Sequence, residues 1–124
     1  MTEEEISTGI DYLTREKFVD DQRYAANFVH DKFRFNKWGK VKIAYMLRQK
    51  RIAENLIEDA LESIPDENYE DTIRELLRIK VKSIKGTAER ERKGKLAVFA
   101  QGRGFESDIA YRIAGEIISV KHED

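Results

Sequence analysis

The sequence predicts an all-α protein built from tandem three-helix repeats that form an elongated, curved helical array. Apolar residues recur every three or four positions through most of the chain, which is the period of one buried helical face. No window alternates apolar and polar residues convincingly, and hairpin turn dipeptides are absent. Apolar residues make up 40% of the chain and charged residues 38%. This balance suits helices around thin cores better than a sheet buried on both faces.

The clearest helical pattern lies between residues 20 and 52, which we interpret as two consecutive helices. The first has an apolar face formed by Tyr24, Ala25, Phe28, Val29 and Phe33. Asp20 or Asp21 is suited to cap the free N–H groups at its start. After a break at residues 36–39, the second helix repeats the period with Ile43, Ala44 and Leu47.

A further helix is predicted over residues 3–14, because Thr2 and Glu5 have the spacing of a capping box. Its apolar edge is Ile6, Ile10 and Leu13. Residues 15–19 are expected to connect it to the next helix. The N-terminus is acidic and has no apolar core, so it does not resemble a signal peptide.

Four more helices are expected downstream, over residues 53–63, 66–84, 89–101 and 106–120. Pro65 is the only proline; it ends the first of these helices and is tolerated in the first turn of the next. Gly86, Gly102 and Gly104 mark the later breaks, where glycine adopts C-capping conformations without penalty.

The chain repeats itself with an offset of 53 residues, the separation of Ile52 and Phe105, which each follow a break and open a helix. At this offset apolar residues match: Ile43 with Leu96, Met46 with Phe99, Ala60 with Ile113, Ile64 with Ile117, Tyr24 with Leu77 and Phe28 with Val81. We therefore predict one three-helix repeat at 20–64 and another at 65–120. Residues 1–15 would supply the last helix of a truncated or reduced first repeat.

Acidic and basic residues are segregated into alternating segments that follow the same repeat. Asp31 is the only acid between residues 31 and 51, whereas residues 52–73 carry eight acids and no base. Charged helix exteriors often only solvate a protein, but solvation alone does not explain segregation that recurs at one offset. The candidate partner- or DNA-binding cations are Arg23, Lys32, Arg34, Lys37, Lys40, Lys42, Arg48, Arg78, Lys82, Arg90, Arg92, Lys93, Lys95 and Arg103.

Trp38 is a further candidate, because it lies in the break between two helices and is flanked by lysines. Three interpretations remain open. The ring fills the joint as part of the core, it anchors a partner protein as tryptophan often does in binding hot spots, or it stacks on a nucleobase.

Catalytic chemistry has little support in the sequence. There are two histidines and no cysteine, so no thiolate nucleophile or thiolate metal site is available. His30 is interpreted as a surface residue, and Gly39-Lys40 and Gly94-Lys95 lack the other residues of a phosphate-binding loop. No catalytic residue, cofactor or metal site is predicted. No apolar run approaches the roughly 20 residues of a membrane helix, so a cytoplasmic protein is expected.

The motifs resemble a known family. They are Val19-Asp20-Asp21-x-Arg23-Tyr24-Ala25-x-x-Phe28-Val29, Trp38-Gly39-x-x-Lys42-Ile43-x-x-x-Leu47 and Lys50-x-Ile52, with Arg103-Gly104-Phe105 near the C-terminus. This pattern is similar to the signatures of the RecX family of recombinase regulators, whose members are built from tandem three-helix repeats. The resemblance implies a non-enzymatic protein that binds RecA and lodges in the groove of the RecA–DNA filament. It would block filament growth or promote disassembly, restraining strand exchange, ATP hydrolysis and the co-protease activity of the SOS response.

Two departures from the family pattern stand out. Members usually begin with a complete first repeat, and they favour glycine where this chain has Arg51, although arginine adopts positive φ only at a cost. The leading hypothesis is a monomeric filament-binding regulator. The alternative is a stand-alone helical DNA-binding module, which the net charge of −1 disfavours. An enzyme is a distant third.

Overall fold

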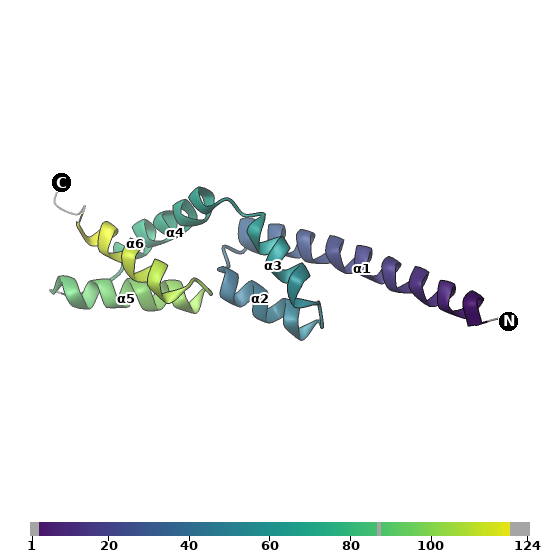
Figure 1. Cartoon of the computed structure of the whole chain (residues 1–124). Helices are drawn as coiled ribbons and strands as arrows, with labels where there is room; N and C mark the ends of the chain where they lie inside the picture. Colours follow the sequence, from purple (N-terminus) through teal and green to yellow (C-terminus); the bar gives the residue numbers. More distant parts are fainter. Residues whose placement is uncertain (1–2, 87, 120–124) are drawn as a thin grey trace.

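A computed structural model describes the backbone of residues 3–86 and 88–119 and the side chains of residues 13–86 and 88–119. These ranges contain no strand. They form α1 (Glu3–Arg34), α2 (Lys40–Gln49), α3 (Glu54–Glu62), α4 (Asp66–Val81), α5 (Glu89–Gly102) and α6 (Ser107–Ser119). Figure 1 shows an elongated molecule in which α1 extends away from the packed helices at one end and α4, α5 and α6 form the other. The predicted all-α array of three-helix units is confirmed, and the helices predicted downstream of residue 52 end within three residues of the observed bounds.

The predicted break at residues 15–19 is wrong, because α1 is one continuous helix of 32 residues. This segment contains neither glycine nor proline, and the Lys17 ammonium lies 2.6 Å from the Asp21 carboxylate one turn away. Such pairs support a helix interior, so Asp21 is a mid-helix residue and not a cap. Thr2 of the predicted capping box lies outside the described residues. The assignment of residues 1–15 to a preceding repeat stays a prediction.

The second and third helices of the two units follow the predicted offset of 53 residues. α2 ends at Gln49 and α5 at Gly102, and the next helices begin at Glu54 and Ser107. The cores correspond as well. Ile43 and Leu96 are both fully buried, and so are Ile57 and Ala110. The internal repeat read from these segments therefore reflects two helix pairs with the same packing.

The first helices do not follow that offset, so the predicted matches of Tyr24 with Leu77 and Phe28 with Val81 are wrong. Tyr24 is 42% exposed, whereas Leu77 is fully buried. The buried residues of α1 are Ala25 and Val29, which correspond to Ile73 and Leu77 of α4 at an offset of 48. The second repeat accommodates the difference with a longer second helix, because α5 has 14 residues and α2 has 10.

Arg51 and Gly104 occupy equivalent helix C-termini and both have positive φ, at 61° and 96°. In each case the next residue donates its N–H to a carbonyl five residues earlier: Ile52 to Leu47 at 3.2 Å and Phe105 to Ala100 at 3.1 Å. This is the Schellman arrangement, which usually carries glycine. Arginine therefore occupies a backbone conformation that favours glycine in the first repeat.

Replacing Arg51 by glycine is expected to raise the free energy of unfolding by about 0.5–1 kcal/mol. Relief of a left-handed conformation that costs about 1–2 kcal/mol outweighs the added entropy of the unfolded chain. Urea unfolding followed by circular dichroism would measure the difference. Gln49→Gly, two residues earlier inside α2, is the matched control and should destabilise. Equal losses in both variants would contradict the assigned strain.

Candidate interaction surface

The two sequence motifs around Trp38-Gly39 and Arg103-Gly104 meet at the joint between the repeats. The N–H of Gly39 donates to the carbonyl of Arg103 at 2.8 Å, and the N–H of Val41 donates to the carbonyl of Gly104 at 3.0 Å. A Cβ on Gly39 would lie 2.2 Å from the Gly104 carbonyl atoms. The two backbones therefore approach so closely that only glycine fits.

The Arg103 side chain also contacts the first repeat across this joint. Its guanidinium donates to the carbonyl of Lys37 at 3.3 Å and to the carbonyl of Asn36. These contacts satisfy carbonyls in the break between α1 and α2. Partner binding by Arg103 stays a prediction, and the residue already has a structural task in the free protein.

Tyr69 of α4 connects the two repeats through its hydroxyl. The N–H of Lys40 donates to this oxygen at 2.9 Å, and the hydroxyl donates to the carboxylate of Glu106. Burial raises the pKa of Tyr69, and the hydrogen bond to Glu106 raises this pKa further. The ring packs 5.8 Å from Phe33 and 5.4 Å from Phe105, measured between ring centroids. Sequence reasoning missed this bridge.

Trp38 lies half-buried against the core beside the joint, which supports the first of its three interpretations. Its ring also carries cations. The Lys42 ammonium lies 4.3 Å and the Lys32 ammonium 5.0 Å from the ring centroid. The Lys40 ammonium lies 4.7 Å from the Tyr69 ring. Aromatic faces attract cations at these distances, so the rings hold the lysines in a compact group.

We call Lys32, Lys37, Trp38, Lys40 and Lys42 the junction cluster. Within the described part of the chain, none of its four lysines forms an ion pair. Two of them lie in the first turn of α2, which contains no acid. Cations are unfavourable at a helix N-terminus. Violations of such local rules are expected at functional sites.

Other predicted cations of the first repeat differ in their surroundings. The Arg48 guanidinium Nε lies 2.9 Å from a Glu54 carboxylate oxygen, a contact that raises the pKa of Arg48 and lowers that of Glu54. Arg34 lies 5.8 Å from the ring of the exposed Phe35. Arg23 is exposed on α1. Arg48 is therefore the least available of the three for a partner.

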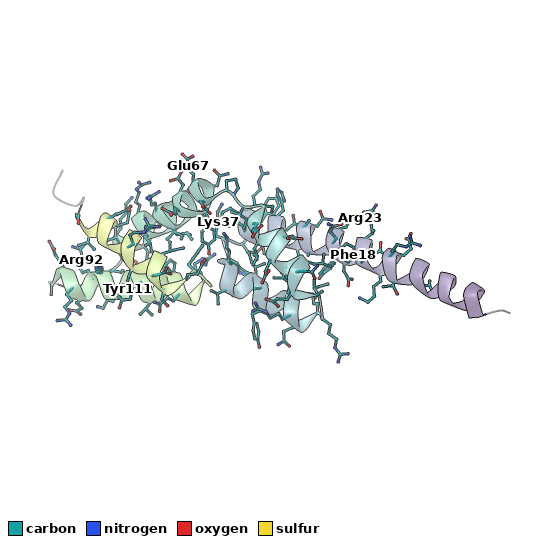
Figure 2. All side chains as sticks on the ribbon, in the orientation of Figure 1. Phe18, Arg23, Lys37, Glu67, Arg92 and Tyr111 are labelled. Atoms are coloured by element: carbon teal, nitrogen blue, oxygen red, sulfur yellow. The ribbon has the colours of Figure 1, made fainter. Side chains whose placement is uncertain are left out.

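The predicted cations of the second repeat form a separate group. Arg78, Lys82 and Arg90 are exposed and Arg92 and Lys93 are half-buried, and none of these five pairs with an acid among the described residues. Lys95 differs, because its ammonium lies 3.2 Å from Glu91 and donates to the carbonyl of Lys85 at 2.7 Å. Figure 2 shows Lys37 near the joint and Arg92 at the opposite end of the second repeat. The structure thus separates the predicted residues into two cationic surfaces.

A network of four charges, which sequence reasoning did not identify, joins α4 and α6. Arg74 Nε lies 2.9 Å from Glu116, and Arg112 Nη2 lies 2.8 Å from Glu70. These hydrogen bonds raise the pKa values of both arginines and lower those of both glutamates. The sequence signal that could have indicated this network is the four-residue spacing between Glu70 and Arg74 and between Arg112 and Glu116, since such pairs are neighbours on a helix. The network neutralises these charges within the repeat.

The described residues show neither a metal-binding cluster nor a membrane-spanning helix. No three His, Asp or Glu side chains within the described ranges gather closely enough to hold a metal ion. No helix in the part of the chain searched is both long and apolar enough to cross a membrane.

Two family models match this chain, one in each repeat. The second three-helix domain of RecX matches residues 20–61, and the third three-helix domain matches residues 67–113. Together they cover more than half of the chain. The chain belongs to the RecX family. The joint described above is therefore the contact between two successive RecX domains.

Relatives and a solved structure agree with this assignment. Regulatory protein RecX of Clostridium botulinum (strain Eklund 17B / Type B) is 34% identical over 124 residues, which cover 98% of this chain and 58% of that protein. Regulatory protein RecX of Clostridium acetobutylicum is 36% identical over 121 residues, covering 92% and 54%. The crystal structure of RecX from Lactobacillus salivarius has the same fold, with a TM-score of 0.77, 24% identity and coverage of 96% of this chain and 77% of that one. The chain spans little more than half the length of the two clostridial relatives.

Proposed function

We propose that this protein is a non-enzymatic regulator that binds RecA and its nucleoprotein filament in the cytoplasm. Membership of the RecX family, whose relatives are named regulatory proteins, is the observation that carries the proposal. Bound in the filament groove, the protein restrains filament growth, strand exchange, ATP hydrolysis and co-protease activity.

The geometry supports this proposal in two ways. An elongated array of repeats presents a long surface, which suits contact with several protomers of a filament at once. The junction cluster adds four lysines without ion pairs among the described residues, and these attract acidic protein surface or DNA phosphates. The second cationic group, at the end of α4 and the start of α5, offers another contact further along the array.

Cosedimentation with filaments tests the proposal. The protein is expected to pellet with RecA filaments formed on single-stranded DNA with ATP and magnesium. It should also slow RecA-dependent ATP hydrolysis and strand exchange, and bind the same DNA far more weakly when RecA is absent. Unaltered RecA activities together with no pelleting on filaments would refute the proposal.

The same experiment addresses the stand-alone DNA-binding module, which the lysines around Trp38 favour and the net charge of −1 disfavours. That function requires tight binding to naked DNA, with an affinity that falls steeply as salt rises. Equal affinity for naked DNA and for filaments would favour this alternative.

A further inference from the structure

A hollow of about 470 Å³ opens where the first repeat passes into the second. Its walls come from the last turns of α1, from the connection between α3 and α4, and from the first two turns of α4. This volume lies in the range of pockets that hold small ligands or anchoring side chains. Because both repeats contribute walls, the hollow exists only when the joint is assembled.

Apolar residues form one part of this lining, namely Phe33, Ile64 and Pro65. Ile64 is buried and belongs to the core cluster, and Phe33 packs against that cluster. Phe33 also lies 5.8 Å from Tyr69, the residue that bridges the repeats. The apolar lining is therefore held in place by the joint and is suited to receive one apolar side chain.

The α1 side of the hollow is cationic. His30, Arg34 and Lys37 line it, and neither Arg34 nor Lys37 forms an ion pair with any described residue. The acid of the opposite wall is Asp71, whose carboxylate lies 3.0 Å from the guanidinium of Arg74. The positive charge of this site therefore remains uncompensated, and it favours a carboxylate-bearing ligand.

Two polar groups complete the lining, and an exposed aromatic ring outside the lining lies next to Arg34. The amide of Asn68 and the hydroxyl of Thr72 line the α4 side and make no hydrogen bond to another described residue. Phe35, which follows Arg34 in the chain, is 71% exposed with the Arg34 guanidinium 5.8 Å from its ring. Exposed aromatic and arginine side chains beside a pocket are typical of binding hot spots.

We propose that this hollow docks an acidic protein segment that inserts one leucine- or phenylalanine-sized side chain against Phe33 and Ile64. Carboxylates on either side of that anchor pair with Arg34 and Lys37, and Asn68 and Thr72 pair with the peptide backbone. The inference rests on the proposed function in one respect, because it assigns the segment to RecA. DNA fits less well, because a phosphate backbone has no apolar group for the lining formed by Phe33, Ile64 and Pro65.

Plugging the hollow tests this directly. Asn68→Trp places an indole in the hollow, and Asn55→Trp makes the same exchange at an exposed position of α3 outside it. Arg34→Glu reverses one charge in the lining of the hollow. Its control is Lys85→Glu, which changes the net charge equally at a residue after α4 that does not line the hollow. Asn68→Trp and Arg34→Glu are each expected to weaken binding to RecA filaments about tenfold or more, as loss of a hot spot does, whereas both controls stay within about twofold of wild type. Circular dichroism confirms that each variant is folded.

A second probe separates this inference from the proposed function. A fluorescein-labelled acidic peptide with a single leucine is titrated with the full chain, beside a peptide with serine in that place. Saturable binding that requires the leucine and is lost in Asn68→Trp supports the docking site whether or not RecA is the partner. Equal affinity of both peptides, or of Asn68→Trp and Asn55→Trp, overturns it. The inference would also be overturned if Asn68→Trp lost affinity for a single-stranded oligonucleotide but kept its affinity for the leucine peptide.

Discussion

Gly104→Ala is expected to lower the free energy of unfolding by about 2–5 kcal/mol, since overpacking costs about 1–3 kcal/mol and a left-handed backbone about 1–2 kcal/mol. A Cβ on Gly104 would lie 2.3 Å from Lys42 Cβ and 2.9 Å from Lys42 N, and φ is +96°. The clash is with backbone and Cβ atoms, which cannot move without opening the joint. Urea unfolding followed by circular dichroism at 222 nm would measure the loss.

Gly94→Ala is the matched control for that experiment. A Cβ on Gly94 meets nothing within 4 Å, and alanine is a better helix former than glycine inside α5. The control is expected to stabilise the protein by about 0.5–1 kcal/mol. If Gly104→Ala were as stable as wild type, the close backbone contact between the repeats would be wrong.

Reversing Lys37, Lys40 and Lys42 to glutamate is expected to abolish inhibition of RecA-driven strand exchange. The change removes the unpaired cations of the junction cluster and presents three carboxylates in their place, and like charges across an interface strongly disfavour binding. The melting temperature should move by only a few degrees, because these side chains are not buried and acids are favourable in the first turn of α2. Strand exchange and thermal unfolding, measured on the same preparation, would check both statements.

Reversing Arg78, Lys82 and Arg90 changes the net charge equally on the other cationic surface and serves as the comparison. A larger effect at the junction cluster would assign that surface to RecA. Equal loss in both variants would mean that the junction cluster contributes no more to binding than the second cationic group does. Full inhibition by the first variant would remove the junction cluster from the mechanism.

Local sequence features accounted for the parts of the fold that neighbouring residues decide. Helical periodicity, the single proline and the helix-ending glycines placed α2 through α6 within a few residues. The offset of 53 was detectable because α2 and α5, and likewise α3 and α6, bury corresponding residues. The continuous α1 was missed because Asp20 or Asp21 was interpreted as a helix cap, although residues 15–19 contain no glycine or proline.

The candidate site was predicted only in part. Cationic positions could be named from the sequence, but their surroundings could not. In the sequence, Arg48 and Arg103 cannot be distinguished from Lys40 and Lys42 as candidate binding cations. In the structure, Arg48 pairs with Glu54 and Arg103 donates to backbone carbonyls. The rings that hold the lysines are Tyr69 of α4 and Trp38 in the break after α1. No local pattern encodes such contacts.

The sequence by itself determined that the chain is helical, repeated and segregated in charge. Helicity follows from residues three or four positions apart, the repeat from matches 53 positions apart, and the charge segregation from the composition of successive segments. Tertiary structure alone decided where the repeats meet, which cations remain unpaired, and that a hollow opens between Phe33 and Asn68. Those features depend on Gly39 touching Gly104 and on Tyr69 reaching Lys40 and Glu106. Contacts across such separations follow from how helices pack and not from the spacing of residues along any one of them.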